Sequence, residues 1–313
     1  QEGANVGVSA VVGNFDDAQT GVKTLFSDES LREELAQRGY FLSSANSINW
    51  GRVLPQIVYY ISAYCDLLAQ GAVTEGEPVN FCVPTGNFGN ILSAFYAKEM
   101  GLPIGRLLCA SNSNNVLTDF IATGKYDRNR PFYNTVSPSM DILISSNLER
   151  LLYLLSGGDD KLVAGYMKEL SDTGCYQVSE EMRKKIQSVF VGGFSSEAET
   201  EATIGKMMDE HKYLIDTHTA VAFHVLEQYR KETGDQTKTV VASTASPFKF
   251  CDAMLDALNV TDKATGTALL DQLAEVSGMP APQPLATLKD KQVRFTSWTE
   301  KEQMRAVVTD FLK

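Results

Sequence analysis

Cysteines are few in this sequence and show no pattern. There are five, an odd number, scattered along the chain: Cys65, Cys82, Cys109, Cys175 and Cys251. They form no Cys-x-x-Cys pair and no His/Cys spacing of the kind found in zinc sites, so neither a disulfide framework nor a metal site is indicated. Free cysteines suit a reducing compartment, and we therefore expect a cytoplasmic protein without a bound metal.

Basic residues and long apolar runs are also scarce. Lysine and arginine number 28 against 39 aspartates and glutamates, which gives a net charge of −11. Nucleic-acid binding needs basic surface to displace counterions, so no nucleic-acid partner is expected. The longest apolar stretch, Val53 to Cys65, ends at Asp66 and falls short of the roughly 18 residues that cross a bilayer. We therefore expect no membrane partner, and no signal peptide is indicated because no basic leader precedes an apolar segment.

No internal repeat or low-complexity segment is present. The 313 residues, 43% of them hydrophobic, are enough for one large α/β domain or two smaller ones. The composition is therefore that of a globular chain with a sizeable core.

The stretch from Pro78 to Leu92 has the pattern of a phosphate cradle. Residues 80–83 form an apolar run typical of a buried parallel strand, the loop 85–90 follows, and from Ile91 the apolar residues recur at helical spacing. A helix start has unpaired N–H groups and a positive dipole end, which stabilise an anion, and glycines let the backbone approach it closely. A plain strand-to-helix turn has the same pattern.

The rest of the chain alternates strand and helix patterns, with a helix cap at Asp28 and a polar strand-to-helix corner at 111–115. Such corners are where parallel sheets bind ligands. We predict strands at 6–12, 40–42, 80–83, 107–110 and 239–242, and helical segments at 16–26, 28–38, 54–68, 91–100, 116–121, 138–155, 161–212, 217–229, 247–258 and twice within 265–313.

Five short segments point to a family. They are Ser-Ala-Asn-Ser-Ile-Asn-Trp-Gly-Arg at 44–52, Val-Pro-Thr-Gly-Asn-Phe-Gly-Asn at 83–90, Ser-Pro-Ser-Met-Asp-Ile at 137–142, Asp-Thr-His-Thr-Ala at 216–220 and Ser-Thr-Ala-Ser-Pro at 243–247. In sequence and order they resemble the threonine synthases, from about Gly13 to about Phe250. The resemblance implies an α/β fold of the fold-type-II pyridoxal phosphate enzymes (tryptophan synthase beta-like), with a parallel sheet flanked by helices.

The resemblance also bears on domain organisation. Family members begin with a long portion that nothing here matches, so we expect an N-terminally truncated chain that represents the C-terminal part. Residues 1–44 would be the remnant of a smaller strand-helix-strand domain. Residues 45–313 would form the larger coenzyme-binding domain, with a helical insertion at about 138–212.

For the coenzyme, pyridoxal 5'-phosphate, the resemblance implies two groups of ligands. The ring nitrogen would meet the hydroxyl of Thr244, with Ser243 as the neighbouring alternative; a helix cap before Pro247 would be the purely structural role. The phosphate would lie on backbone N–H groups of Gly86, Asn87, Phe88, Gly89 and Asn90.

Ser47, Asn49 and Arg52 are the expected ligands of a substrate phosphate, because a guanidinium fork and short polar donors at a helix start match its geometry. Asn46 and Ser113 are weaker candidates. The structural alternative is a capped helix with Arg52 paired to a surface carboxylate.

No catalytic residue is assigned within this chain. The family's lysine, which holds the coenzyme aldehyde as a Schiff base, is expected upstream of Gln1, so Lys249 is not a candidate despite its closeness to Thr244 in sequence. His218 could line the pocket or be a hydrogen-bonded structural histidine, and Asp216 is expected to cap a helix. His211 and His224 are expected on helix surfaces.

The resemblance implies threonine synthase activity for the full-length protein, the conversion of O-phospho-L-homoserine and water to L-threonine and phosphate. The fragment alone is expected to be inactive, and a monomer or homodimer is expected. Two alternatives stay open. One is another fold-type-II lyase, such as a serine or threonine dehydratase or a phospholyase; the other is a non-catalytic phosphate-binding relative.

Overall fold

The computed structural model describes residues 3, 5–13, 15–44, 47 and 49–312. They divide into two compact units: unit 1 comprises residues 1–44 and 287–313, and unit 2 comprises residues 45–286. The predicted division had 45–313 as one domain and differs at the C-terminal end. Residues 287–313 belong with unit 1, where the strand at Trp298–Thr299 pairs in parallel with the strand at Ala10–Val11.

Unit 1 is built around that short pair of strands. Asp28 caps the second helix, as predicted, by accepting from the Leu31 N–H at 3.0 Å, and Leu31 and Leu35 are buried. The strand predicted at 40–42 is wrong: these residues pair with no strand among the described residues, and Phe41 is 86% exposed. The elements are β1 (Ala10–Val11), α1 (Phe15–Ser27), α2 (Glu29–Gln37), η4 (Leu288–Asp290), β8 (Trp298–Thr299), η5 (Lys301–Gln303) and α15 (Met304–Phe311).

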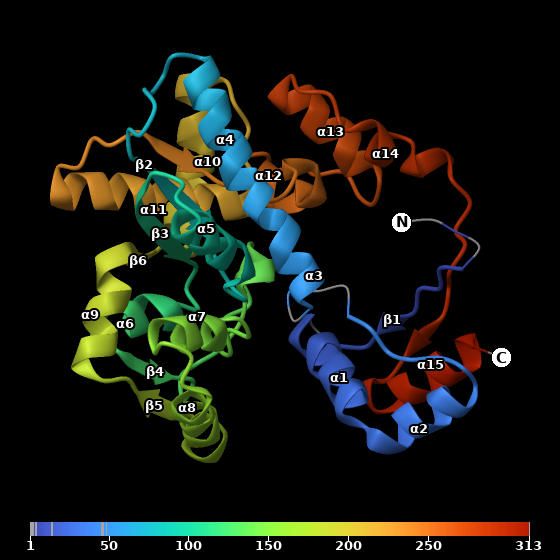
Figure 1. Cartoon of the computed structure of the whole chain (residues 1–313). Helices are drawn as coiled ribbons and strands as arrows, with labels where there is room; N and C mark the ends of the chain where they lie inside the picture. Colours follow the sequence, from blue (N-terminus) through green and yellow to red (C-terminus); the bar gives the residue numbers. More distant parts are fainter. Residues whose placement is uncertain (1–2, 4, 14, 45–46, 48, 313) are drawn as a thin grey trace. The chain divides into compact units, whose positions relative to one another are not determined.

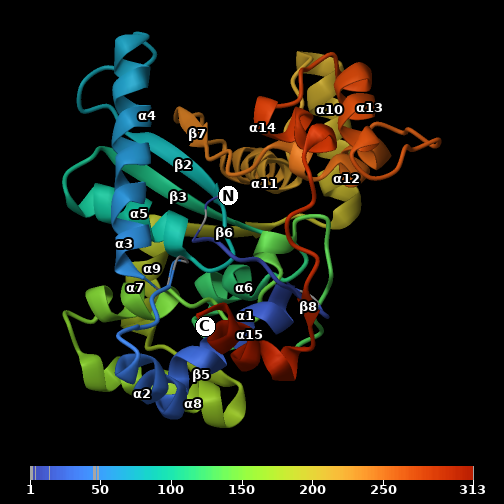
Figure 2. The ribbon, with the colours of Figure 1, turned by 90° about the vertical axis from the view of Figure 1, so that its right-hand side faces the viewer.

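Unit 2 contains a four-stranded parallel sheet in the order β6-β3-β2-β7 (Figures 1 and 2). The strands are β2 (Val79–Pro84), β3 (Ile104–Ser111), β6 (Phe190–Phe194) and β7 (Thr239–Val241). Because all four are parallel, their carboxyl ends share one edge, and the loops that follow them converge there.

Both faces of this sheet are covered, which explains the continuous apolar runs of its central strands. Side chains on one face, such as Phe81 and Cys109, pack against α5 (Gly89–Glu99) and α6 (Val116–Thr123). Their neighbours on the other face, such as Cys82, pack against α11 (Thr217–Thr233).

The other helices of unit 2 surround this core. Among them, α4 packs on α5, and α10, α12 and α13 contribute to a separate buried cluster. Their bounds, with the small antiparallel pair β4-β5, are α3 (Trp50–Val53), η1 (Leu54–Gln56), α4 (Ile57–Ala69), β4 (Lys125–Asp127), η2 (Pro138–Met140), α7 (Leu148–Leu155), α8 (Asp160–Thr173), β5 (Cys175–Gln177), α9 (Glu180–Val189), α10 (Glu197–His211), η3 (Pro247–Lys249), α12 (Cys251–Ala257), α13 (Ala268–Ser277) and α14 (Gln283–Ala286).

The region 138–212 differs from the predicted helical insertion. It supplies β6, an edge strand of the sheet, because Leu107 to Ser111 pair with Phe190 to Phe194. Only η2 and then α7, which begins at Leu148, occupy the helix predicted at 138–155. Among the described residues, no helix is both long and apolar enough to cross a membrane.

Candidate functional site

The loop between β2 and α5 has the geometry of an anion cradle. Phe88, just before the helix, has φ of 62°, a left-handed conformation that is rare for a large side chain. No acceptor within the described ranges pairs with the N–H groups of Gly86, Asn87 and Phe88. The first N–H groups of α5, at Gly89 and Asn90, have no helical acceptor either. Five consecutive donors are therefore available at a helix start.

Close packing explains the two glycines of this loop. A Cβ at Gly86 would lie 2.7 Å from the backbone oxygen of Ser139 and 3.1 Å from the Met140 Cα. A Cβ at Gly89 would lie 2.7 Å from the Ser47 Cβ. The two distances of 2.7 Å are too short for a Cβ, so the loop needs glycine at these positions whether or not a ligand binds.

Residues 145–147 hold this loop from the side of its carbonyls. The Ser145 hydroxyl donates to the Gly86 carbonyl at 2.8 Å. The Asn147 amide Nδ2 donates at 2.8 Å to the Asn87 carbonyl, and its backbone N–H donates to the same oxygen at 3.1 Å. Because the carbonyls are bonded in this way and the N–H groups are not, the loop presents donors rather than acceptors.

A cavity of about 600 Å³ lies in unit 2 and brings three predicted residues together. Arg52, Asn90 and Thr244 come from segments far apart in the sequence and line the same space. The full lining is Arg52, Pro55, Gln56, Tyr59, Tyr60, Ala63, Phe81, Asn90, Val240, Ala242, Ser243 and Thr244. The predicted residues Gly86, Asn87, Phe88, Gly89, Ser47 and Asn49 are not part of it.

Ser243 and Thr244 differ in their hydrogen bonds. The Ser243 hydroxyl lies 3.2 Å from Thr219 Oγ1, and Thr219 also makes a close contact with the Asp216 carboxylate. The Thr219 hydroxyl is the donor in both contacts, so the Ser243 oxygen accepts from it. The Thr244 hydroxyl is unpaired within the described chain. The helix cap before Pro247 is provided by Ser246 rather than by Thr244.

Asp216 and His218 form a buried pair at the start of α11. Asp216 caps the helix, as predicted, by accepting from the His218 N–H at 2.9 Å, and its Oδ1 lies 3.0 Å from His218 Nδ1. His218 Nε2 is buried and has no partner among the described residues, and its ring lies 5.1 Å from that of Phe250. Neither residue lines the cavity. His211 is exposed, and His224 is partly buried near Glu199.

The substrate residues predicted near α3 have different environments. Asn49 caps α3 by accepting from the Gly51 N–H at 2.9 Å, and the Ser47 hydroxyl accepts from Asn147 Nδ2 at 2.8 Å. Arg52 lines the cavity, and no carboxylate within the described chain pairs with its guanidinium. Asn46 lies outside the described residues, and Ser113 is half-buried in the corner after β3.

The sequence did not single out Tyr60 or the residues 145–147. Tyr60 is buried on α4, and its hydroxyl lies 2.5 Å from Asn90 Oδ1 and 3.0 Å from the Asn90 carbonyl. Burial raises the pKa of Tyr60 well above its ordinary value, so this hydroxyl keeps its proton. The sequence offers no signal for these residues, because their role depends on contacts with a loop 30 to 60 positions away.

The corner after β3 is polar but already paired. Asp141 is buried and accepts from Asn112 Nδ2 at 2.8 Å, from Asn114 Nδ2 at 3.0 Å and from the Thr135 hydroxyl at 2.7 Å. Its other oxygen accepts from the Thr135 N–H at 2.9 Å. Apart from the Ser111 hydroxyl, which has no partner among the described residues, these groups satisfy one another.

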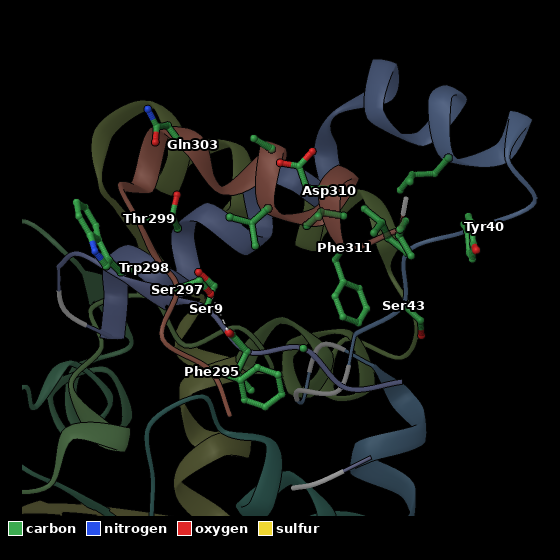
Figure 3. Close-up of a pocket in the computed structure, with 18 of the residues that line it drawn as sticks. Ser9, Tyr40, Ser43, Phe295, Ser297, Trp298, Thr299, Gln303, Asp310 and Phe311 are labelled. Carbon is green, nitrogen blue, oxygen red and sulfur yellow. Dashed lines mark hydrogen bonds between the residues drawn. The ribbon is translucent and has the colours of Figure 1, made fainter. Parts of the chain in front are cut away.

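A second cavity, of about 820 Å³, lies in unit 1. Figure 3 shows the rings of Phe295 and Phe311 within it, with Tyr40 and Trp298 on opposite sides. None of the predicted site residues lines it. The described residues also contain no group of three or more His, Cys, Asp or Glu side chains arranged to hold a metal. The smaller cavity, with its convergent polar groups, is therefore the better candidate site.

Comparison with known proteins bears on this site. Residues 219–308 match the family model described as "Threonine synthase, C-terminal". "Threonine synthase-like 1" of Macaca fascicularis is 44% identical over 283 residues, which cover 90% of this chain and 37% of the relative. "Threonine synthase" of Eremothecium gossypii is 33% identical over 328 aligned residues, covering 99% of this chain and 60% of the relative.

A solved structure is similar over nearly the whole chain. It is that of threonine synthase from Brucella melitensis with pyridoxal phosphate bound, and it is 35% identical with a TM-score of 0.79. The match covers 98% of this chain and 60% of that one. The chain thus spans between about two fifths and three fifths of the length of these relatives.

Proposed function

We propose a function from the premise that the chain belongs to the threonine synthase family and has the fold of the fold-type-II pyridoxal phosphate enzymes. The full-length protein would be a pyridoxal phosphate-dependent carbon–oxygen lyase. It would convert O-phospho-L-homoserine and water to L-threonine and phosphate. The observation that carries this proposal is the loop after β2, with its row of unpaired N–H groups.

The residues of this chain fit the coenzyme. The donors of Gly86 to Asn90 suit its phosphate, because helix N–H groups and the helix dipole stabilise an anion. The coenzyme, when bound, supplies an electron sink for negative charge that develops on the substrate carbons. Unit 2 would be the coenzyme-binding domain, and unit 1 would be part of a smaller one.

Thr244 would meet the coenzyme ring nitrogen. Its hydroxyl is unpaired within the described chain and lines the cavity, whereas the Ser243 hydroxyl is bonded to Thr219. A hydroxyl carries no charge and cannot hold the ring nitrogen protonated as a carboxylate would, so the ring would be a milder electron sink.

Arg52 would bind the substrate phosphate. It lines the cavity without a carboxylate partner, and its planar fork matches a phosphate group. Ser47 and Asn49 would hold the local structure near α3 rather than bind the phosphate themselves, since Asn49 caps α3 and Ser47 accepts from Asn147.

The cavity lining contains no lysine among the described residues. In line with the resemblance to the threonine synthases, the amine that holds the coenzyme aldehyde would come from the part of those proteins that this chain does not match, and the chain alone would bind the coenzyme without turnover. This division of roles can be tested on the isolated chain and the full-length protein together.

The experiment adds pyridoxal 5'-phosphate to both proteins and follows binding by fluorescence. Threonine and phosphate release from O-phospho-L-homoserine are then measured. We expect binding by both and turnover by the full-length protein alone. Steady threonine formation by the isolated chain would overturn the assignment of the amine, and absence of binding by the full-length protein would overturn the proposal as a whole.

A second candidate function is favoured by one observation. Identity is 44% to a protein named threonine synthase-like 1 and 33% to one named threonine synthase. Another fold-type-II lyase would share the cradle and differ in its substrate. Assays of the full-length protein with free serine, free threonine and related phosphoamino acids separate the two. Coenzyme binding without turnover of any of them would indicate a non-catalytic relative.

A further inference from the structure

Tyr60 and Asn90 meet at the wall of the 600 Å³ cavity. Tyr60 lies on α4 and is 3% exposed. Its ring packs edge-on against that of Phe81, with 5.1 Å between the ring centroids. Its hydroxyl reaches Asn90, in the first turn of α5, at 2.5 Å from Oδ1 and 3.0 Å from the backbone oxygen. Burial keeps the phenol protonated, so it acts as a donor here.

The length of this contact decides which end of the Asn90 amide faces Tyr60. A separation of 2.5 Å fits an O–H···O bond and is shorter than an N–H···O bond, whose usual range is about 2.7–3.2 Å. Oδ1 therefore points at Tyr60. Nδ2 is left with two protons and no acceptor within the described chain, although Asn90 lines the cavity.

We propose that Tyr60 is a positioning residue. It fixes the side-chain amide of Asn90 so that Nδ2 faces the cavity and donates to an anionic oxygen of the ligand. Arg52 and Thr244 line the same cavity, so the ligand would meet donors from three segments. Without the Tyr60 hydroxyl the amide could rotate and present Oδ1, which repels an anion.

The identity of the ligand rests on the proposed function, whereas the fixed amide does not. An anionic oxygen could belong to the coenzyme phosphate or to the phenolate of its ring. Binding of inorganic phosphate and of pyridoxal, which lacks the phosphate, separates these two sources. If Asn90→Ala weakens the binding of inorganic phosphate, Nδ2 donates to the coenzyme phosphate. If it weakens the binding of pyridoxal, Nδ2 donates to the phenolate of the ring.

The first measurement needs no ligand. The side-chain amide of Asn90 is followed by ¹⁵N nuclear magnetic resonance in the unmodified chain, in Tyr60→Phe and in the control Tyr64→Phe. Tyr64 lies on the same helix and is buried, and its hydroxyl bonds the backbone near Thr74 and Glu77. We expect only Tyr60→Phe to shift the Asn90 resonances and speed their exchange. Unchanged Asn90 resonances in Tyr60→Phe would overturn the proposal, even if coenzyme binds.

The second measurement is a double-mutant cycle on pyridoxal 5'-phosphate binding. Loss of one hydrogen bond should weaken binding about fivefold to tenfold in Tyr60→Phe and in Asn90→Ala. The double variant should be no weaker than Asn90→Ala, because Tyr60 acts through Asn90. If the losses of coenzyme affinity in the two single variants add up in the double variant, Tyr60 does not act through Asn90. If the unmodified full-length protein binds no coenzyme, the proposed function fails, while the resonance test still decides the role of Tyr60.

Discussion

Two corners at the same edge of the unit 2 sheet contrast sharply. The corner after β2 has a row of N–H groups without acceptors, and its carbonyls are bonded by residues 145–147. The corner after β3 is richer in polar side chains, yet Asp141 already accepts from Asn112, Asn114 and Thr135. Polar residues at the end of a strand therefore do not identify a binding site; donors that remain unpaired do.

The largest effect on stability is expected at the paired corner. Asp141→Ala removes the shared acceptor of four hydrogen bonds and leaves the Thr135 N–H with no other acceptor in the described chain, which should lower the free energy of unfolding by about 3 kcal/mol. The control is Asp119→Ala, which removes a half-exposed ion pair with Arg130 and should cost less than about 1 kcal/mol. Urea unfolding measures both. Equal losses would show that the Asp141 network is not the source of rigidity at this corner.

A smaller loss of stability, with loss of binding, is expected at the unpaired corner. Gly86→Ala places a Cβ 2.7 Å from the Ser139 oxygen, so the loop must shift, at a cost of about 2 kcal/mol. Coenzyme affinity should fall more than about tenfold, because the N–H groups lose their alignment. Gly165→Ala, where a Cβ meets nothing within 4 Å, is the control. Unchanged affinity in Gly86→Ala, measured by fluorescence titration, would remove the loop from the site.

The hydroxyls of Thr244 and Ser243 line the same cavity and differ in their hydrogen bonds. Thr244→Val should weaken coenzyme binding about fivefold, because an unpaired hydroxyl in the cavity is lost. Ser243→Ala should weaken it less than about twofold, since that hydroxyl is bonded to Thr219. The reverse order would assign the ring nitrogen to Ser243.

The smallest effect is expected at the opposite edge of the sheet. Hydrogen bonds from Thr237 and Tyr229 hold the pKa of Asp235 below its ordinary value, and Asn80 also donates to it. A lowered native pKa stabilises the fold above the unfolded pKa of about 4, and this stabilisation is lost as the pH falls. Asp235→Asn should therefore flatten the decline in stability below about pH 4. Parallel acid profiles for both proteins would show that Asp235 is not the group responsible.

The parts of the fold that follow from local pattern were predictable. β2 and the start of α5 show the expected apolar run and helical spacing, and Asp28 and Asp216 cap helices as expected. β6 was missed because Gly192 and Gly193 are typical of a loop. In the structure a Cβ at Gly193 would lie 2.7 Å from Val225 Cγ1, so packing against α11 requires glycine within the strand.

The site was predictable only in part, and for a similar reason. The segment motifs indicated Arg52, Asn90 and Thr244, and the structure brings these three to one cavity. Tyr60 and Asn147 depend on hydrogen bonds across 30 and 60 residues, respectively, and no periodicity in the sequence encodes such contacts.

The left-handed backbone of Phe88 has a consequence for the thermodynamics of association. Such a conformation is unfavourable for a bulky residue, and here the buried ring packs against Phe190 at a centroid distance of 5.5 Å. The interior therefore enforces the bend in the free chain. The anion-binding loop would therefore be preformed before the ligand arrives, and binding would cost little backbone entropy.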